Sequence, residues 1–432
     1  MDNSPDWLVL DNAAKVYPAA SNRRWSALFR LSMTLTEAID PALLQQAQVR
    51  VAPRFPMYHT RLERGAFWYY LERSDENLRV RPEGPWPCMP LRPRENDGYL
   101  FRVLYYRNRI TVEFFHALTD GSGGLCYLKT LVAEYLTLRY GADIPRGDEI
   151  LDCDEPPQPE ESEDSFFRYA GQAGSSRREA KAYRVRGTLP RDGFVTLVTG
   201  KMPVDVLLKK AREKGVSLTT WLTAVLILAV QELQEAEGLP RRRQREVKIN
   251  VPVNLRKFFP SRTLRNFASY VNPGIDPRVG AHDFDEILNR VYHFLGAEVT
   301  PRQLLAKFTA NVRSEQIKAV RIMPLFIKNF VLKQVFLAVG DRKSSTCISN
   351  LGNQVLPAEM AAYVTDMAFV LGPLAINPVA CSTISYNGVL TFHILRTIRE
   401  PALPRAFFRR LVELGVPVEI ESNDRSSVCR TV

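Results

Sequence analysis

The chain has 432 residues, of which 45% are hydrophobic and 24% are charged, close to the average for a soluble globular protein. This composition excludes a disordered or fibrous protein, and the length suits two or three ordinary domains or one large unit of two related halves that share a cleft. The 58 Lys and Arg residues outnumber the 47 Asp and Glu residues, and the net charge of +11 favours anionic ligands without choosing among them.

The first 151 residues mix strand and helix patterns. Their periodicity predicts strands at 26–35, 67–71, 98–106 and 110–116, and helices at 36–49 and 125–139. Proline, acidic residues and serine then dominate 152–176, where there is almost nothing to bury. We therefore predict a linker at 152–176, between an N-terminal half at 1–151 and a C-terminal half at 177–432.

The C-terminal half continues the mixture. Its patterns predict strands and helices in the following ranges: strands at 194–202, 247–253, 345–349, 365–370, 380–385 and 389–395, and helices at 206–214, 217–235, 283–298, 301–317, 323–339 and 404–414. The apolar run at 322–339 is interrupted by Pro324 and Lys328, so it predicts a buried or groove-lining helix rather than a membrane span, with docking on a membrane surface as the lesser alternative. Together the elements predict an α/β or α+β sandwich of open sheets.

Other features of the chain bear on location and ligands. The six cysteines form no Cys-x-x-Cys pair and the chain begins without an apolar leader, which indicates the reducing cytoplasm. The run Arg241-Arg242-Arg243 lies between a helix and a strand and is typical of a solvated loop, so we expect no nucleic-acid binding. His59, His282, His293 and His393 have no companions at metal-ligand spacing, and we expect no metal.

The chemistry is expected at His116. Residues 110–116 alternate in polarity, which directs His116 inward at the end of a strand, and Asp120-Gly121 follows before a helix. A general base needs an imidazole with one nitrogen free and the other held by a hydrogen bond. Asp120 would either orient the imidazole directly or pair with an arginine that locks the loop. A satisfied core histidine followed by a turn and a helix N-cap explains the same local pattern.

The segment Phe115-His116-x-x-x-Asp120-Gly121 resembles the His-His-x-x-x-Asp-Gly signature of the coenzyme A-dependent acyltransferase superfamily. Chloramphenicol acetyltransferase, the condensation domains of peptide synthetases and alcohol acetyltransferases belong to it. Further segments resemble its bacterial alcohol acetyltransferase-like branch in content and order: Arg54-Phe55-Pro56, Gly65-Ala66-Phe67-Trp68-Tyr69, Val251-Pro252-Val253-Asn254-Leu255-Arg256 and Ile348-Ser349-Asn350-Leu351-Gly352. The resemblance implies two chloramphenicol acetyltransferase-like halves with an active-site tunnel between them.

The resemblance also implies roles for individual residues. His116 takes the position of the general base, and Phe115 stands where the family has its first histidine; as part of a regular strand it would face away from His116. Asp120 and Gly121 would be structural, with Arg256 as the partner of Asp120. Asn254, Ser349 and Asn350 lie at strand ends and are candidate contacts to an oxyanion or substrate, although polar turns explain them as well.

The expected reaction moves an acyl group, by analogy acetyl, from a coenzyme A thioester to an alcohol or amine. Acyl-CoA would be a co-substrate, and no bound cofactor is expected. We expect a monomer whose contact with membranes is at most peripheral. Two alternatives stay open: a condensation enzyme that takes its donor from a separate acyl carrier protein, and a catalytically silent binding or scaffold protein of the same fold.

Overall fold

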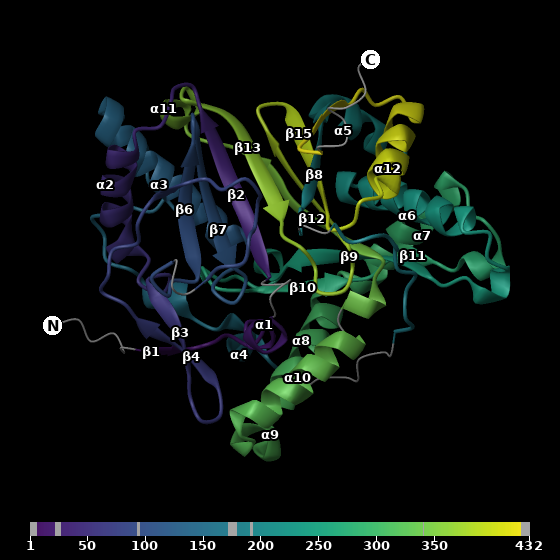
Figure 1. The fold of residues 1–432 in the computed structure, drawn as a ribbon, viewed down its shortest axis with the longest axis horizontal. Coiled ribbons are helices and arrows are strands. Elements are labelled where there is room, and N and C mark those ends of the chain that lie inside the picture. Colours follow the sequence, from purple (N-terminus) through teal and green to yellow (C-terminus); the bar gives the residue numbers. More distant parts are fainter. Residues whose placement is uncertain are drawn as a thin grey trace.

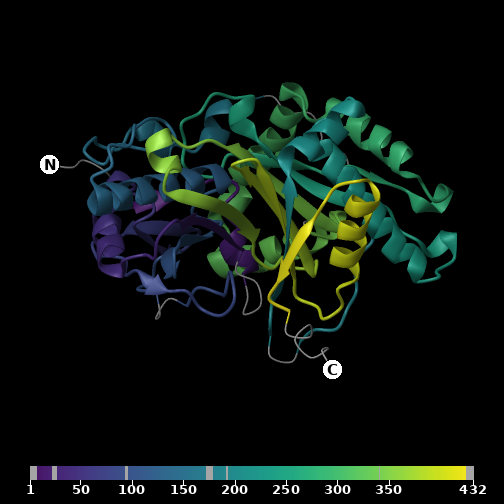
Figure 2. The same ribbon diagram turned by 90° about the horizontal axis from the view of Figure 1, so that it is seen from above.

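The computed structural model describes residues 7–21, 27–92, 96–171, 179–190, 193–339 and 341–424. Its strands form two large open sheets and one small sheet, β1-β4-β3. The two large sheets lie side by side in the middle of the molecule, and helices cover their outer sides (Figures 1 and 2). The predicted mixed architecture of open sheets is confirmed.

The N-terminal sheet has the order β13-β2-β7-β6-β5. Its strands are β2 (Leu28–Leu35), β5 (Arg81–Pro82), β6 (Phe101–Tyr106), β7 (Arg109–Phe115) and β13 (Val364–Leu371). Two helices, α2 (Pro41–Val51) and α3 (Gly121–Tyr140), pack against each other, and α3 also packs on β2 and β7. The small sheet beside it contains β1 (Trp7–Val9), β3 (Thr60–Arg64) and β4 (Tyr69–Arg73).

The C-terminal sheet has the order β10-β9-β12-β14-β15-β8-β16, and β11 also pairs with β9. Its strands are β8 (Thr196–Pro203), β9 (Val247–Asn254), β10 (Ala268–Val271), β11 (Gly274–Ile275), β12 (Thr346–Gln354), β14 (Val379–Tyr386), β15 (Val389–Arg396) and β16 (Glu419–Ser422). Four helices accompany it: α5 (Val204–Glu213), α6 (Leu218–Ala236), α7 (Phe284–Glu298) and α12 (Ala402–Glu413). The remaining helices are α1 (Val16–Ala20), α4 (Ser165–Tyr169), α8 (Pro301–Gln316), α9 (Lys318–Ile322), α10 (Leu325–Val339) and α11 (Ala358–Ala361).

Strand β13 belongs to the C-terminal half in sequence but to the N-terminal sheet in space. It runs antiparallel to β2, with Phe369 opposite Leu31, and Figure 1 shows the two strands side by side. The next strand, β14, returns to the C-terminal sheet between β12 and β15. The chain therefore crosses between the two sheets after the predicted linker, and the boundary at 152–176 does not separate all of their strands.

Part of the predicted linker is packed against both halves. Glu161 is buried and accepts two hydrogen bonds from the Arg54 guanidinium, at 2.5 and 2.7 Å. Phe166, in α4, packs edge-on against Phe267 and Phe308. An acidic segment that looks solvated thus contributes a buried ion pair and an aromatic anchor.

Three sequence predictions are corrected by the structure. Helix α2 begins at Pro41 rather than at 36, because the Asp40 carboxylate caps it by accepting from the N–H groups of Ala42 and Leu43. Helix α3 begins at Gly121 rather than at 125, so the glycine-rich segment is a helical first turn and not a loop. Helix α10 is not a buried helix over its first half, where Leu325 and Lys328 are buried but Phe326 is 75% exposed.

Within the described part of the chain, no single helix is long and apolar enough to cross a membrane. Helices α5 and α6 meet the length and composition required only together, and an 86° bend separates them.

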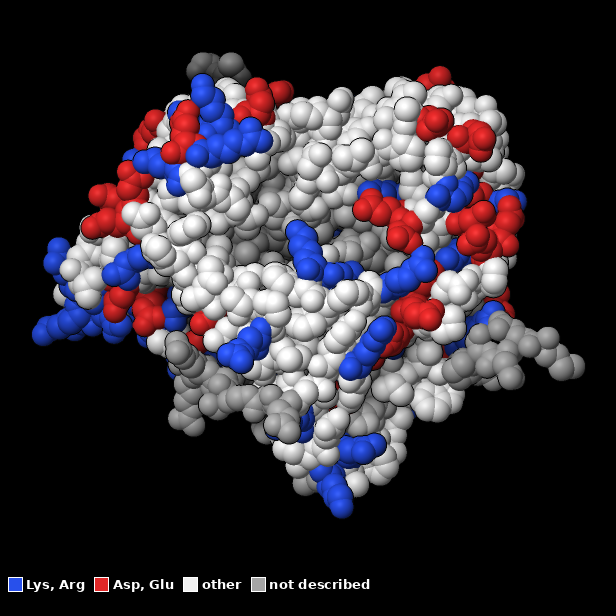
Figure 3. Space-filling view, turned by 180° about the vertical axis from the view of Figure 1, so that it is seen from behind, with Lys and Arg blue, Asp and Glu red and all other residues white. Residues whose placement is uncertain are grey.

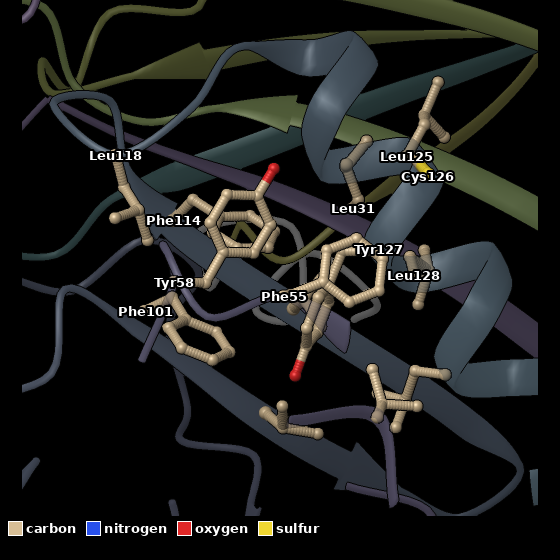
Figure 4. Close-up of a cluster of buried hydrophobic side chains, with 14 of the residues drawn as sticks. Leu31, Phe55, Tyr58, Phe101, Phe114, Leu118, Leu125, Cys126, Tyr127 and Leu128 are labelled. Carbon is tan, nitrogen blue, oxygen red and sulfur yellow. The ribbon is translucent and has the colours of Figure 1, made fainter. Parts of the chain in front are cut away.

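An aromatic cluster fills the N-terminal core beneath α3 (Figure 4). Phe114 stacks on Phe101 and on Phe29, with ring centroids 5.4 and 5.6 Å apart, and Tyr58 and Tyr127 meet its ring edge-on. Ring pairs at these separations stabilise a core beyond the area they bury. The cluster fixes the end of β7, where the candidate base lies.

Gly123 allows the first turn of α3 to approach another segment closely. A Cβ built on it would lie 2.1 Å from the carbonyl oxygen of Leu264 and 2.3 Å from Thr119 Oγ1. We expect Gly123→Ala to lower the free energy of unfolding by about 1–3 kcal/mol, as overpacking does.

Gly296, in α7, is the matched control, because its Cβ would meet nothing within 4 Å. Alanine is the better helix former, so Gly296→Ala should be neutral or stabilise by up to about 1 kcal/mol. Urea unfolding of both variants tests this pair, and equal stabilities would contradict the close approach at Gly123.

Candidate active site

His116 lies in the turn between β7 and α3. Its backbone N–H donates to the carbonyl of Ala27 at 2.9 Å, and β7 itself ends at Phe115. The regular pleat ends there, and that Phe115 and His116 face opposite sides stays a prediction. The ring of Tyr17 packs against both: it stacks on His116, with centroids 5.0 Å apart, and meets Phe115 at 6.5 Å.

Asn266 determines which imidazole nitrogen is free. Its Nδ2 group donates to the backbone carbonyl of His116 at 3.0 Å, and a carbonyl can only accept, so the orientation of the amide is fixed. Its Oδ1 then lies 2.9 Å from His116 Nδ1, which must carry the proton in order to donate. In the neutral ring Nε2 consequently keeps its lone pair.

Asp11 supports Asn266 from behind. Its Oδ2 accepts from Asn266 Nδ2 at 3.0 Å, and its Oδ1 accepts from the backbone N–H of Ala14 at 2.7 Å. Burial raises the pKa of this carboxyl, whereas the nearby Arg265 guanidinium and the hydrogen bonds from Asn266 and Ala14 oppose that rise. Hydrogen bonds therefore connect the fully buried carboxyl of Asp11 through the Asn266 amide to the His116 imidazole.

Two aromatic rings limit the rotation of the imidazole. Tyr17 lies nearly parallel to it, at an interplanar angle of 21°, and Phe29 meets it edge-on with centroids 5.3 Å apart. Tyr17 comes from α1 and Phe29 from β2. Together with the Asn266 contact, they hold the ring in one orientation.

The Asp120 carboxylate is divided between two tasks. Its Oδ1 caps α3 by accepting from the N–H groups of Ser122 and Gly123. Its Oδ2 accepts from Arg256 Nη1 at 2.7 Å and from the backbone N–H of Phe267 at 2.9 Å. Of the two roles considered for Asp120, these contacts fit pairing with an arginine, and the helix N-cap is present as well.

Arg256 joins the same two segments. Besides Asp120, its guanidinium donates from Nη2 to the carbonyls of Thr263 at 2.8 Å and Arg265 at 2.6 Å. The segment 263–267 is thereby folded onto the motif loop, and Thr119 Oγ1 donates to Leu264 at 2.6 Å. Because Asn266 lies within this segment, the ion pair indirectly sets the position of the imidazole partner.

The other predicted site residues lie in two places. Asn254 caps the turn after β9 and donates from Nδ2 to Ser122 Oγ at 3.1 Å, next to the first turn of α3. Asn350, in β12, donates to Thr219 Oγ1 at 3.0 Å and accepts from Gly352 N at 2.7 Å. Ser349 precedes it in β12, opposite Ser382 of β14.

Gly121 connects the motif to β12. A Cβ on Gly121 would lie 2.6 Å from Leu351 Cδ2, so the start of α3 and the strand that carries Ser349 and Asn350 are in contact. The structure thus brings the motif into contact with both the β9 and the β12 segments. Their roles toward a substrate stay predictions.

Three residues beside the imidazole were not predicted from the sequence: Asn266, Asp11 and Tyr17. Asn266 is 150 positions from His116, and no spacing rule connects them. Asp11 belongs to no motif, and a single aspartate near the start of the chain indicates no partner. A signal for Tyr17 is lacking, because a tyrosine in a short helix is ordinary.

The described cavities lie apart from His116. The largest, about 1130 Å³, is lined chiefly by 181–190, 193–195 and 373–378, and one of about 450 Å³ lies beside Arg54 and Glu161. Figure 3 shows a hollow near the centre of the back face, with Lys and Arg side chains at its edge. The tunnel between the halves stays a prediction.

In the described part of the chain, no three His, Cys, Asp or Glu side chains are grouped so that they could hold a metal.

Asp120→Asn tests the ion pair. Asparagine keeps the N-cap but turns an amide toward the Arg256 guanidinium, whose charge then has no partner in a setting where Asp120 is 6% exposed. We expect the free energy of unfolding to fall by about 3 kcal/mol or more, measured by urea unfolding.

Asp276→Asn is the control, since Asp276 likewise caps a turn and pairs with Arg278 at the surface. An exposed pair contributes at most about 1 kcal/mol. A similar loss in both variants would show that the contact between Asp120 and Arg256 has no special weight.

Comparison with known proteins gives a partial family match and a group of similar folds. Residues 200–389 match the family model described as alcohol acetyltransferase. No curated protein sequence matches the chain.

Solved structures of similar fold include polyketide synthase associated protein 5 from Mycobacterium tuberculosis, with 15% identity, a TM-score of 0.59, and coverage of 93% of this chain and 96% of that one. TRI101 of F. sporotrichioides, solved with coenzyme A and T-2, is 10% identical with a TM-score of 0.60, and the match covers 95% of this chain and 99% of that one. The epimerization domain from the third module of tyrocidine synthetase B is 13% identical with a TM-score of 0.56, and the match covers 94% of this chain and 96% of that one.

The family match and the acetyltransferase neighbour support the predicted class of enzyme, an acyltransferase. The chain thus has the fold of these acyltransferase and condensation-type structures, and residues 200–389 match the alcohol acetyltransferase family model.

Proposed function

We propose that this protein transfers an acyl group from a coenzyme A thioester to an alcohol or amine, with His116 Nε2 as the general base. The observation that carries the proposal is the contact between Asn266 Oδ1 and His116 Nδ1, which leaves Nε2 as the proton acceptor. A base held in one tautomer and one orientation is what proton abstraction requires.

The proposed reaction needs neither a metal nor a covalent enzyme intermediate. His116 Nε2 takes the proton of the acceptor hydroxyl or amine as its oxygen or nitrogen attacks the thioester carbonyl. The tetrahedral oxyanion then collapses, the carbon–sulfur bond breaks, and the imidazolium returns the proton to the departing thiolate. The products are an ester or amide and free coenzyme A.

Charge that develops on the carbonyl oxygen requires hydrogen-bond donors nearby. Ser122 is a candidate, because its hydroxyl oxygen accepts from Asn254 Nδ2 and its own proton remains available to donate. Asn350 uses one amide hydrogen on Thr219 and has a second one. We propose that Asn254 acts through Ser122, and that Ser349 and Asn350 contact substrate.

The donor is proposed from the neighbours. TRI101 was solved with coenzyme A. The epimerization domain of tyrocidine synthetase B has the same fold and favours a second candidate, in which a separate acyl carrier protein presents the thioester. We place the reaction in the cytoplasm, on the grounds of the cysteine pattern. Comparing acetyl-CoA with an acyl carrier protein thioester, each with the same alcohol, separates the two candidates.

His116→Ala should lower kcat for thiol release from acetyl-CoA by at least about a hundredfold, the contribution of a general base. His293→Ala, which removes an exposed histidine of α7, is the control and should leave kcat unchanged. A folded His116→Ala protein with normal turnover would remove His116 from this role, and a parent without thioester-dependent activity would favour the silent scaffold.

Asn266→Ala should lower kcat by about tenfold or more while KM changes little, because the imidazole loses the contact that fixes its tautomer and position. Asn272→Ala is matched, since Asn272 is equally buried and its amide is bonded to Asn250 and Glu179. Loss of kcat in both variants, in proportion to their stability, would mean that Asn266 is only a structural residue.

A further inference from the structure

The chain exposes a row of large apolar side chains on α9 and α10. Ile322, Phe326 and Phe330 follow one another at intervals of four and are 70%, 75% and 65% exposed. Ile317, just before α9, is 54% exposed. Phe326 and Phe330 are spaced so that they lie on one face of α10, and Ile322 precedes them at the end of α9. Soluble monomers seldom leave such large apolar side chains together in water.

The charged residues within this segment have one sign. From 316 to 340 the sequence has no Asp or Glu, whereas Lys318, Arg321 and Lys333 are exposed. The fourth cation, Lys328, turns inward, donates to the carbonyl of Phe67 at 2.8 Å and lies over the Trp68 ring. This segment therefore combines exposed apolar side chains with exposed cations.

The row lies on a projecting part of the molecule. In Figure 1, α9 forms the lower tip, next to the hairpin of β3 and β4, and Leu325 N–H donates to Ala66 in that hairpin at 2.9 Å. Phe67 at the hairpin tip is 47% exposed and is a further large apolar side chain at this end of the molecule. At this end Figure 3 shows Lys and Arg side chains among uncharged surface.

We propose that this surface, formed by Phe67, Ile317, Ile322, Phe326 and Phe330 with Lys318 and Arg321, docks the protein on an anionic lipid bilayer. Aromatic and aliphatic side chains insert at the boundary of headgroups and acyl chains, and cations beside them meet the lipid phosphates. Because this apolar surface projects from the molecule, it suits insertion into a lipid interface better than burial in a protein groove. A second copy is disfavoured, because it would bring like charges together.

Flotation of the full chain with lipid vesicles tests the proposal. Wild type should bind vesicles of phosphatidylcholine with phosphatidylglycerol and bind pure phosphatidylcholine more weakly. Phe326→Ser with Phe330→Ser should lower binding to the anionic vesicles by at least about tenfold, through the apolar area lost. Lys318→Gln with Arg321→Gln should lower it by about tenfold and leave binding to neutral vesicles unchanged.

Val279→Ser with Val412→Ser is the matched control, because both valines are more than half exposed and lie outside this surface, on the 3-10 turn before α7 and on α12. It should bind vesicles like wild type. Absence of wild-type binding to anionic vesicles, or unchanged binding of the Phe326 and Phe330 variant, would overturn the proposal. So would a dimer in light scattering that only this variant abolishes, since the row would then be a contact between copies.

Discussion

The ion pair between Asp120 and Arg256 holds together two parts of the chain that have no connection in sequence. One carboxylate oxygen satisfies the start of α3, and the other receives the guanidinium and the Phe267 amide. Removing both charges from water is costly unless each finds several partners, and here each does. This contact and the hydrogen bond from Asn266 to Asp11 together set the position of Asn266, and hence the tautomer of His116.

The sequence allowed the fold to be predicted well wherever hydrophobic periodicity was strong. The observed strands at 28–35, 109–115, 379–386 and 389–396 lie close to their predicted bounds. Short elements such as β10 and β11 were missed, because two to four residues carry no measurable period. The predicted start of α3 is four residues too late, because a glycine-rich segment resembles a loop unless its N-cap is recognised.

The site was predictable only in its local part. His116 and Asp120 share a motif five residues long, and their junction between strand and helix can be inferred from the sequence. Asn266 and Asp11 come from segments 150 and 105 positions away, on either side of it, and a single sequence contains nothing that relates such distant residues. Helix α10 is apolar enough to predict a buried or groove-lining helix, but apolar content does not reveal which face finds a partner.

The crossing of β13 constrains how the molecule is made. The N-terminal sheet has an open edge at β2 until residues 364–371 have been synthesised, because β13 is the strand that covers that edge. During translation, most of the polypeptide must emerge from the ribosome before this sheet is complete. Contacts of such long sequence separation slow folding. An uncovered edge at β2 would invite pairing with other nascent chains, which makes the unfinished protein a candidate for chaperone protection.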